Sequence, residues 1–155
     1  MFNSNNFDDI ITLNDTDKNH FKLLLSEHFI NFSDISDFPN NKGLYFLFYQ
    51  NILIYIGSAS TTGRTIKIRC QQYLQKGNGG ESFRGKIELL KKISSDEAIQ
   101  FIKENISAKF IDCNNLDKDN ILQLEQVAIC CYQPLLNFIL KKFNYEMLKT
   151  TNLSH

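Results

Sequence analysis

The stretch Gly43–Ala59, GLYFLFYQNILIYIGSA, contains two short apolar runs that predict the strands of a β-hairpin. We expect the strands at about 43–49 and 52–58. Each run carries a triplet with one glycine and one tyrosine, Gly43-Leu44-Tyr45 in the first and Tyr55-Ile56-Gly57 in the second. The two tyrosines are therefore either apolar filler of a hairpin or phenols with a chemical role.

The length of the hairpin loop decides whether the two tyrosines share a face, because side chains alternate along a strand. A two-residue loop at Gln50-Asn51 would pair Tyr45 with Ile56 and place Tyr55 on the opposite face. A three-residue loop is expected to pair Tyr45 with Tyr55. The sequence lacks the Asn-Gly or Asp-Gly that two-residue loops prefer. We therefore predict an odd-length loop with both phenols on one face.

The composition favours a single folded domain spanning residues 1–155. Apolar residues make up 43% of the 155 residues, which is not a disordered composition. The four cysteines show no metal-binding spacing, the N-terminus does not resemble a signal peptide, and no apolar run is long enough to span a membrane. These features predict a cytoplasmic protein with reduced thiols, with neither a membrane partner nor a small-molecule cofactor.

The remaining elements follow from helical or alternating apolar spacing. We expect an α/β (α+β) fold in which helices flank a small antiparallel sheet. The expected helices are 16–31, 64–76, 82–93 (after a glycine cluster), 95–104 (capped by Ser94 or Ser95) and 116–132, with a further strand at 107–113 and a C-terminal segment, 135–148, that is either strand or helix.

Positive charge is concentrated in residues 64–92, which hold eight Lys or Arg against two acidic residues. A local excess of six positive charges suits a phosphate-binding surface, although a solvated helical face would look the same. The residues from this region that we expect to bind DNA are Arg64, Lys67, Lys76, Arg84 and Lys86.

Glu125 is out of place on the expected 116–132 helix. At helical angles its carboxylate falls in the apolar arc with Ile121, Ala128 and Tyr132. A carboxylate in such a position needs a metal, a proton or a cationic partner, because an unpaired buried charge is costly. The pattern fits a functional carboxylate and a salt-bridged structural one equally well.

Together these landmarks resemble the GIY-YIG nuclease superfamily over residues 43–137. The match consists of the two triplets, Arg69 in the following helix, Glu125 in a later helix, and Asn137 after Gln133-Pro134. The resemblance implies three central antiparallel strands flanked by helices, with extensions at 1–40 and 138–155. It also implies hydrolysis of DNA phosphodiester bonds with Mg²⁺ or Mn²⁺.

By resemblance the catalytic residues are Tyr45, Tyr55, Arg69 and Glu125. Glu125 would hold the metal, and Arg69 would stabilise the charge that develops on the phosphate. A phenol is a poor base unless nearby positive charge lowers its pKa. We expect Tyr55 to orient or deprotonate the attacking water and Tyr45 to position that water or the phosphate. The expected supporting residues are Gly57, Ser58, Tyr73 and Asn137.

Two positions differ from parts of the family. Ser58 stands where repair-type members often carry lysine, and Tyr73 stands where some members carry histidine. The alternatives are a DNA-binding domain without activity and a protein-interaction module. Within the nuclease reading, restriction-like, homing and repair roles stay open, and cutting both strands would need a homodimer or two encounters.

Overall fold

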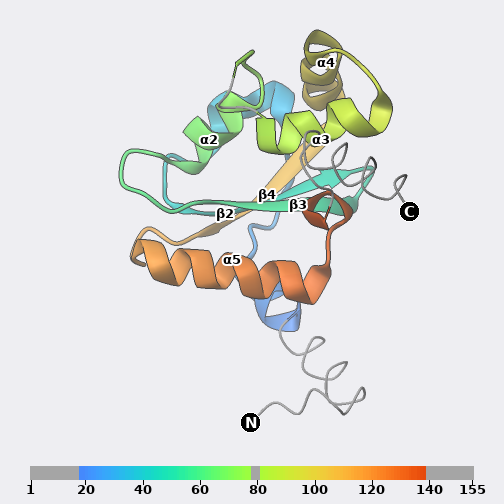
Figure 1. Ribbon diagram of the computed structural model, residues 1–155. Helices are drawn as coiled ribbons and strands as arrows, with labels where there is room; N and C mark the ends of the chain where they lie inside the picture. Colours follow the sequence, from blue (N-terminus) through green and yellow to red (C-terminus); the bar gives the residue numbers. More distant parts are fainter. Residues whose placement is uncertain (1–17, 78–80, 139–155) are drawn as a thin grey trace, which may run out of the picture.

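The computed structural model describes residues 18–77 and 81–138. The fold has three layers, with an antiparallel sheet in the middle (Figure 1). Helices α2 (Ile66–Gln72), α3 (Glu81–Lys91) and α4 (Ser95–Asn105) cover one face of the sheet, and α5 (Lys118–Tyr132) covers the other. This confirms the expected mixture of helices around a small sheet.

The sheet has four strands in the described residues, in the order β1-β4-β2-β3, and every pair is antiparallel. The strands are β1 (Ile30–Asn31), β2 (Gly43–Tyr49), β3 (Ile52–Ala59) and β4 (Ile106–Asp112). The hairpin and the third strand are confirmed. The expected count of three strands is wrong because the two-residue β1 adds to the free side of β4.

The same strand explains why the first helix ends earlier than expected. Residues 18–24 are helical, whereas the apolar spacing predicted a helix to residue 31. After this helix Ser26 donates its backbone N–H to the carbonyl of Phe110 and accepts the N–H of Phe110 on its side chain, at 2.9 and 3.0 Å. The backbone groups on the open side of β4 thus pair with this segment, which is extended instead of helical. A 3₁₀ helix, η1 (Phe32–Asp37), follows β1.

The hairpin loop contradicts one prediction, although the conclusion drawn from it holds. Tyr49 pairs with Ile52, so the loop has two residues, Gln50 and Asn51, both left-handed with φ of 50° and 63°. A bulge then shifts the register, since Phe48 pairs with Leu53 but Leu47 pairs with Tyr55. The extra residue in β3 brings the two tyrosines back to one face.

The tyrosines are not direct partners, contrary to the expectation for a three-residue loop. Tyr45 lies opposite Gly57, and Tyr55 lies opposite Leu47. The four residues therefore line the same face of the hairpin.

The four helices α2 to α5 follow the expected order, although η1 was not expected and α2 is shorter than predicted. Helix α2 begins after Thr65, whose side chain accepts the N–H of Ile68, and it ends at Gln72, capped by Tyr73, rather than at 76. Ser94 caps α4 in a capping box with Glu97. Helix α5 ends at Gln133, which is left-handed and precedes Pro134. A short helix, α6 (Leu135–Phe138), follows.

Each face of the sheet builds its own apolar core. The core under α2, α3 and α4 contains both hairpin tyrosines together with Tyr73, Phe83 and Ile102. The core under α5 is lined by residues that include Leu44, Phe46, Ile56, Ile111, Ile121 and Ala128. The alternation along β2 and β3 sends Tyr45, Leu47 and Tyr55 to one core and Leu44, Phe46 and Ile56 to the other.

No helix within the described ranges is both long and apolar enough to cross a membrane. The expected extension after residue 138, the start of the N-terminal extension and the glycines at 79 and 80 lie outside the described residues.

The two left-handed loop residues generate a stability prediction. Replacing Gln50→Asn together with Asn51→Gly supplies the pair that tolerates positive φ, and since a left-handed non-glycine residue costs about 1–2 kcal/mol, we expect unfolding to become harder by about 1 kcal/mol. Chemical denaturation measures this change. Gln100→Asn in α4 is the control and should be mildly destabilising because asparagine is a poorer helix former. A loss of stability in the loop variant would contradict the left-handed turn.

Candidate active site

The site begins where Tyr45 crosses Gly57. A Cβ placed on Gly57 would lie 2.3–2.4 Å from the Cζ, Cε2 and hydroxyl atoms of Tyr45. Real Cβ atoms do not approach other atoms so closely, so only glycine fits opposite this ring. The tyrosine of the first triplet and the glycine of the second therefore form one packing unit.

Tyr45 is buried and paired. Its side chain is 1% exposed, and its hydroxyl shares a 2.6 Å hydrogen bond with the hydroxyl of Tyr73 at the end of α2. Burial raises the pKa of Tyr45 well above 10, and the neighbouring Tyr73, Cys70 and Tyr55 raise it further. Tyr45 therefore stays protonated at neutral pH in the protein alone and is a poor candidate for a base.

Tyr55 lies closer to the surface, with 8% of its side chain exposed. Its ring packs against Phe83 with centroids 5.2 Å apart. The ammonium group of Lys86, also on α3, lies 5.3 Å from the centre of the same ring. Tyr55 is thus held between the sheet and α3, with a cation beside it.

Arg69 connects the phenols to the carboxylate. It lies in the last turn of α2, and its Nη1 donates to the side-chain oxygen of Gln72 at 3.1 Å. Burial opposes its charged form, but the nearby Tyr45, Tyr73 and Tyr55 outweigh burial and raise the pKa of Arg69 above its ordinary value. The guanidinium is therefore a fixed cation in front of three phenols.

Glu125 reaches the same place from the other layer. It lies on α5 in a half-buried position, between the buried Ile121 and Ala128. Burial raises the pKa of Glu125 above 4.5, while a hydrogen bond from the Ser58 side chain and the charge of Arg69 partly oppose that rise. The structure thus brings Ser58, Arg69 and Glu125 together at the outer strand of the sheet.

Asn137 fixes that outer strand. Its amide oxygen accepts the N–H of Ile56 at 2.8 Å, and its amide nitrogen donates to the carbonyl of Ile56 at 2.9 Å. Ile56 stands between Tyr55 and Gly57, so the side chain of Asn137 occupies backbone groups that an edge strand otherwise leaves open. Its position supports the site without facing the phenols.

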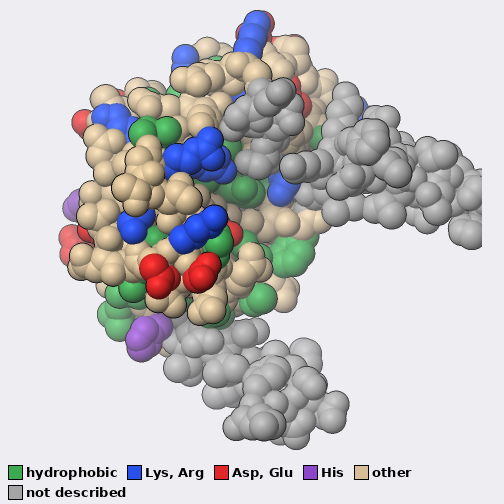
Figure 2. All heavy atoms as spheres, turned by 60° about the vertical axis from the view of Figure 1, so that its left-hand side comes forward, with side chains coloured by type: hydrophobic (Ala, Val, Ile, Leu, Met, Phe, Trp, Pro, Cys, Tyr) green, Lys and Arg blue, Asp and Glu red, His purple; other side chains and the backbone are tan. Residues whose placement is uncertain are grey.

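The residues expected to bind DNA do not behave alike. Arg64 is exposed, and Lys86 lies beside Tyr55. Lys67 donates to the carbonyl of Ser36 at 2.8 Å, and Lys76 pairs with Asp96 on the surface at 2.9 Å. Figure 2 shows Lys and Arg side chains at several separate places on the forward face, with acidic side chains beside them. The positive run in the sequence therefore does not form one continuous patch on that face.

Arg84 requires a correction. We expected a DNA contact, but its side chain is only 3% exposed and donates to backbone carbonyls. The prediction failed because charge and spacing alone do not distinguish an exposed arginine from a buried one that binds backbone carbonyls between two helices.

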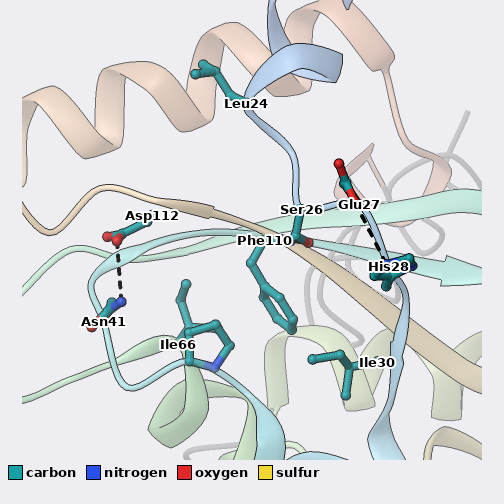
Figure 3. A pocket seen from close by; sticks show the side chains of 10 residues that line it. Leu24, Ser26, Glu27, His28, Ile30, Asn41, Ile66, Phe110 and Asp112 are labelled. Carbon is teal, nitrogen blue, oxygen red and sulfur yellow. Dashed lines mark hydrogen bonds and ion pairs between the residues drawn. The ribbon is translucent and has the colours of Figure 1, made fainter.

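A hollow with a volume of about 430 Å³ lies elsewhere (Figure 3). Its described lining includes Ile30, Ile66 and Phe110, and the hydrogen-bonded pair Asn41 and Asp112 lies at its side. The catalytic residues expected from the sequence are not among its lining residues. We take the surroundings of Arg69 as the candidate site instead, because charged and phenolic groups converge there, whereas the hollow is mainly apolar.

The site suits a divalent cation that needs few protein ligands. Residues 18–77 and 81–138 contain no group of three or more His, Cys, Asp or Glu able to form a metal cage. Glu125, however, is a half-buried carboxylate whose neighbours do not fully stabilise its charge. Mg²⁺ keeps several waters and is often held by one or two carboxylates plus substrate phosphate, so the donor set fits it.

One residue at the site was missed from the sequence. Gln72 orients Arg69, and the three-residue spacing on a helix was a signal that could have identified it. Ser58 and Tyr73 were noted from the sequence as departures from a family pattern. The contact of Ser58 with Glu125 and that of Tyr73 with Tyr45 could not be predicted, because each joins segments that only the fold brings together.

Comparison of the chain with protein-family models, with curated proteins and with solved structures found no match. The site is therefore argued from its own geometry.

The raised pKa of Glu125 predicts how stability depends on pH. The folded state favours the protonated carboxyl, so the contribution of Glu125 to stability is most favourable below its unfolded-state pKa and is lost as pH rises through its folded-state pKa. Glu125→Gln lacks this loss, and we expect its Tm at pH 7.5 to exceed that of wild type by on the order of 1–3 °C, with little difference at pH 4.

Thermal unfolding followed by circular dichroism at a series of pH values measures this difference. The exposed Glu104→Gln on α4 is the control and should follow wild type at each pH. If wild type instead gains stability relative to Glu125→Gln as pH rises, Arg69 outweighs burial and the description of Glu125 is wrong.

Proposed function

We propose that this protein is a divalent-metal-dependent DNA endonuclease of the GIY-YIG type. The observation that carries the proposal is the convergence of Glu125 and three phenols on Arg69. These groups come from the sheet and from the helices on both of its faces. A structural salt bridge would need only the arginine and the carboxylate, and it would leave the phenols unexplained.

The proposed substrate is a phosphodiester, because Arg69 is the group that such a reaction requires. A guanidinium is permanently charged and offers a fork of donors to phosphate oxygens. Gln72 holds one side of the fork at 3.1 Å, so Arg69 is oriented before a substrate arrives. Preorganised donors of this kind stabilise charge that develops in the transition state.

Glu125 supplies the ligand for the proposed Mg²⁺ or Mn²⁺. A bound divalent cation would polarise the scissile phosphate and stabilise the leaving oxygen. The ionised form of Glu125, which burial disfavours, would be stabilised by such a cation. Ser58 holds the carboxylate from β3 and fixes its direction.

The two hairpin tyrosines take different roles. Tyr55 is 8% exposed and stands beside Lys86, and we assign to it the orientation or deprotonation of the attacking water. Tyr45 is 1% exposed and hydrogen-bonded to Tyr73, so it is better suited to holding Arg69 than to touching water or phosphate. This revises the role expected for Tyr45 from the sequence.

Cleavage of supercoiled plasmid tests the function. With Mg²⁺ or Mn²⁺ we expect wild type to produce nicked circles first, because one site of this kind cuts one strand. Glu125→Ala should reduce the initial rate by on the order of a hundredfold or more, since it removes the metal ligand. A chelator should stop cleavage, and the exposed Glu104→Ala should cleave like wild type.

Equal cleavage by wild type and Glu125→Ala would point to a contaminating nuclease. No cleavage by wild type across plasmid, branched and single-stranded DNA would favour a DNA-binding or protein-interaction role instead.

A further inference from the structure

Arg84 is the one charged side chain that is buried among those the structure describes. It lies on α3 and reaches back to the end of α2. Its Nη1 donates to the carbonyls of Gln72, at 3.4 Å, and Gln75, and its Nη2 donates to the carbonyl of Gly77 at 3.1 Å. Arg84 thus binds the backbone carbonyls at the end of α2 and in the segment that follows it.

The contacts explain how a guanidinium is tolerated inside the protein. The carbonyl of Gln72 lies at the C-terminal end of α2, where partial negative charge gathers and a cation is stabilised, and the carbonyls of Gln75 and Gly77 supply further acceptors. Glu88 adds a carboxylate 3.9 Å from Nε, the atom of Arg84 that has no hydrogen bond among the described residues. The Ser95 hydroxyl in turn donates to Glu88. The network therefore joins α2, α3 and the start of α4.

Gln72 links this network to the candidate site. Its backbone carbonyl accepts from Arg84, and its side-chain oxygen accepts from Arg69. The next residue is Tyr73, which ends α2 and shares the 2.6 Å hydrogen bond with Tyr45. A change in the backbone at Gln72 would reach Arg69 and Tyr73 together.

We propose that Arg84 is a positioning residue: by holding the carbonyl of Gln72 and those that follow, it fixes the directions of the Arg69 guanidinium and the Tyr73 hydroxyl. It does not touch DNA. A lysine cannot replace it fully. The two terminal nitrogens of the guanidinium together donate to three carbonyls, whereas an ammonium group is a single point of charge.

The first test uses the protein without DNA or metal and does not depend on the proposed function. We expect proton NMR of wild type to show a downfield hydroxyl proton from the Tyr45–Tyr73 pair, assigned by its loss in Tyr73→Phe. Arg84→Met should broaden or remove this signal, and Arg84→Lys should give an intermediate result.

Two control variants separate local from general effects. Ile102→Val weakens the same core from α4, and Lys103→Met removes an exposed charge from that helix. Both should keep the hydroxyl signal. A wild-type signal in folded Arg84→Met or Arg84→Lys would overturn the positioning role, and if Arg84→Met fails to fold, Arg84→Lys decides the question.

The second test is kinetic and rests on the proposed function. We expect Arg84→Lys to lower kcat for plasmid nicking by roughly tenfold or more, while KM stays within about twofold, because an interaction needed in the transition state is weakened rather than DNA binding. A raised KM with normal kcat would mean that Arg84 contacts DNA. If wild type does not cleave DNA, the proposed function fails, and the NMR result alone decides the role of Arg84.

Discussion

The fit of the Tyr45 ring against the backbone of Gly57 is the constraint on which the site depends. No side chain can stand at position 57 without displacing the ring. The ring in turn places its hydroxyl beside Tyr73, and this fixes the distance between the hairpin and α2. A buried hydroxyl pair also strongly disfavours other arrangements, because separating the hydroxyls would leave two polar groups unsatisfied in the core.

The outer strand of the sheet is where the two layers meet. Helix α2 brings Arg69 from one side of the sheet and α5 brings Glu125 from the other (Figure 1), and Ser58 of β3 donates a hydrogen bond to Glu125. An edge strand allows this approach because nothing lies beyond it in the sheet as described. Asn137 makes two hydrogen bonds to the backbone of Ile56 and thereby fixes the position of β3 between Tyr55 and Gly57.

The sequence predicted the parts of the fold that depend on local pattern. The hairpin strands, α4 with its Ser94 cap and the end of α5 before Pro134 all follow from short-range rules. Strand β1 did not, because it forms by pairing with β4, far along the chain. The two-residue loop did not, because Gln50 and Asn51 adopt left-handed conformations without a glycine and the bulge at Ile54 leaves no mark in the apolar pattern.

The site shows the same division. Glu125 stood out from the sequence because a carboxylate in an apolar arc is visible from helical spacing alone. The burial of Arg84 and the pairing of Tyr45 with Tyr73 were not visible, since each joins segments that helical or strand periodicity does not connect. Charge content indicated a basic region, but only the fold shows which of its members stay on the surface.

The most direct measurement of the central claim is a crystal structure of Tyr55→Phe bound to a DNA duplex in the presence of Mn²⁺. The substitution removes the proposed proton acceptor while leaving the ring in place, so the uncut complex should accumulate. We predict an anomalous scattering peak beside Glu125 and a phosphate contacted by Arg69. A metal bound elsewhere, or DNA seated on a face that leaves Arg69 and Glu125 uncovered, would contradict the assignment of this site.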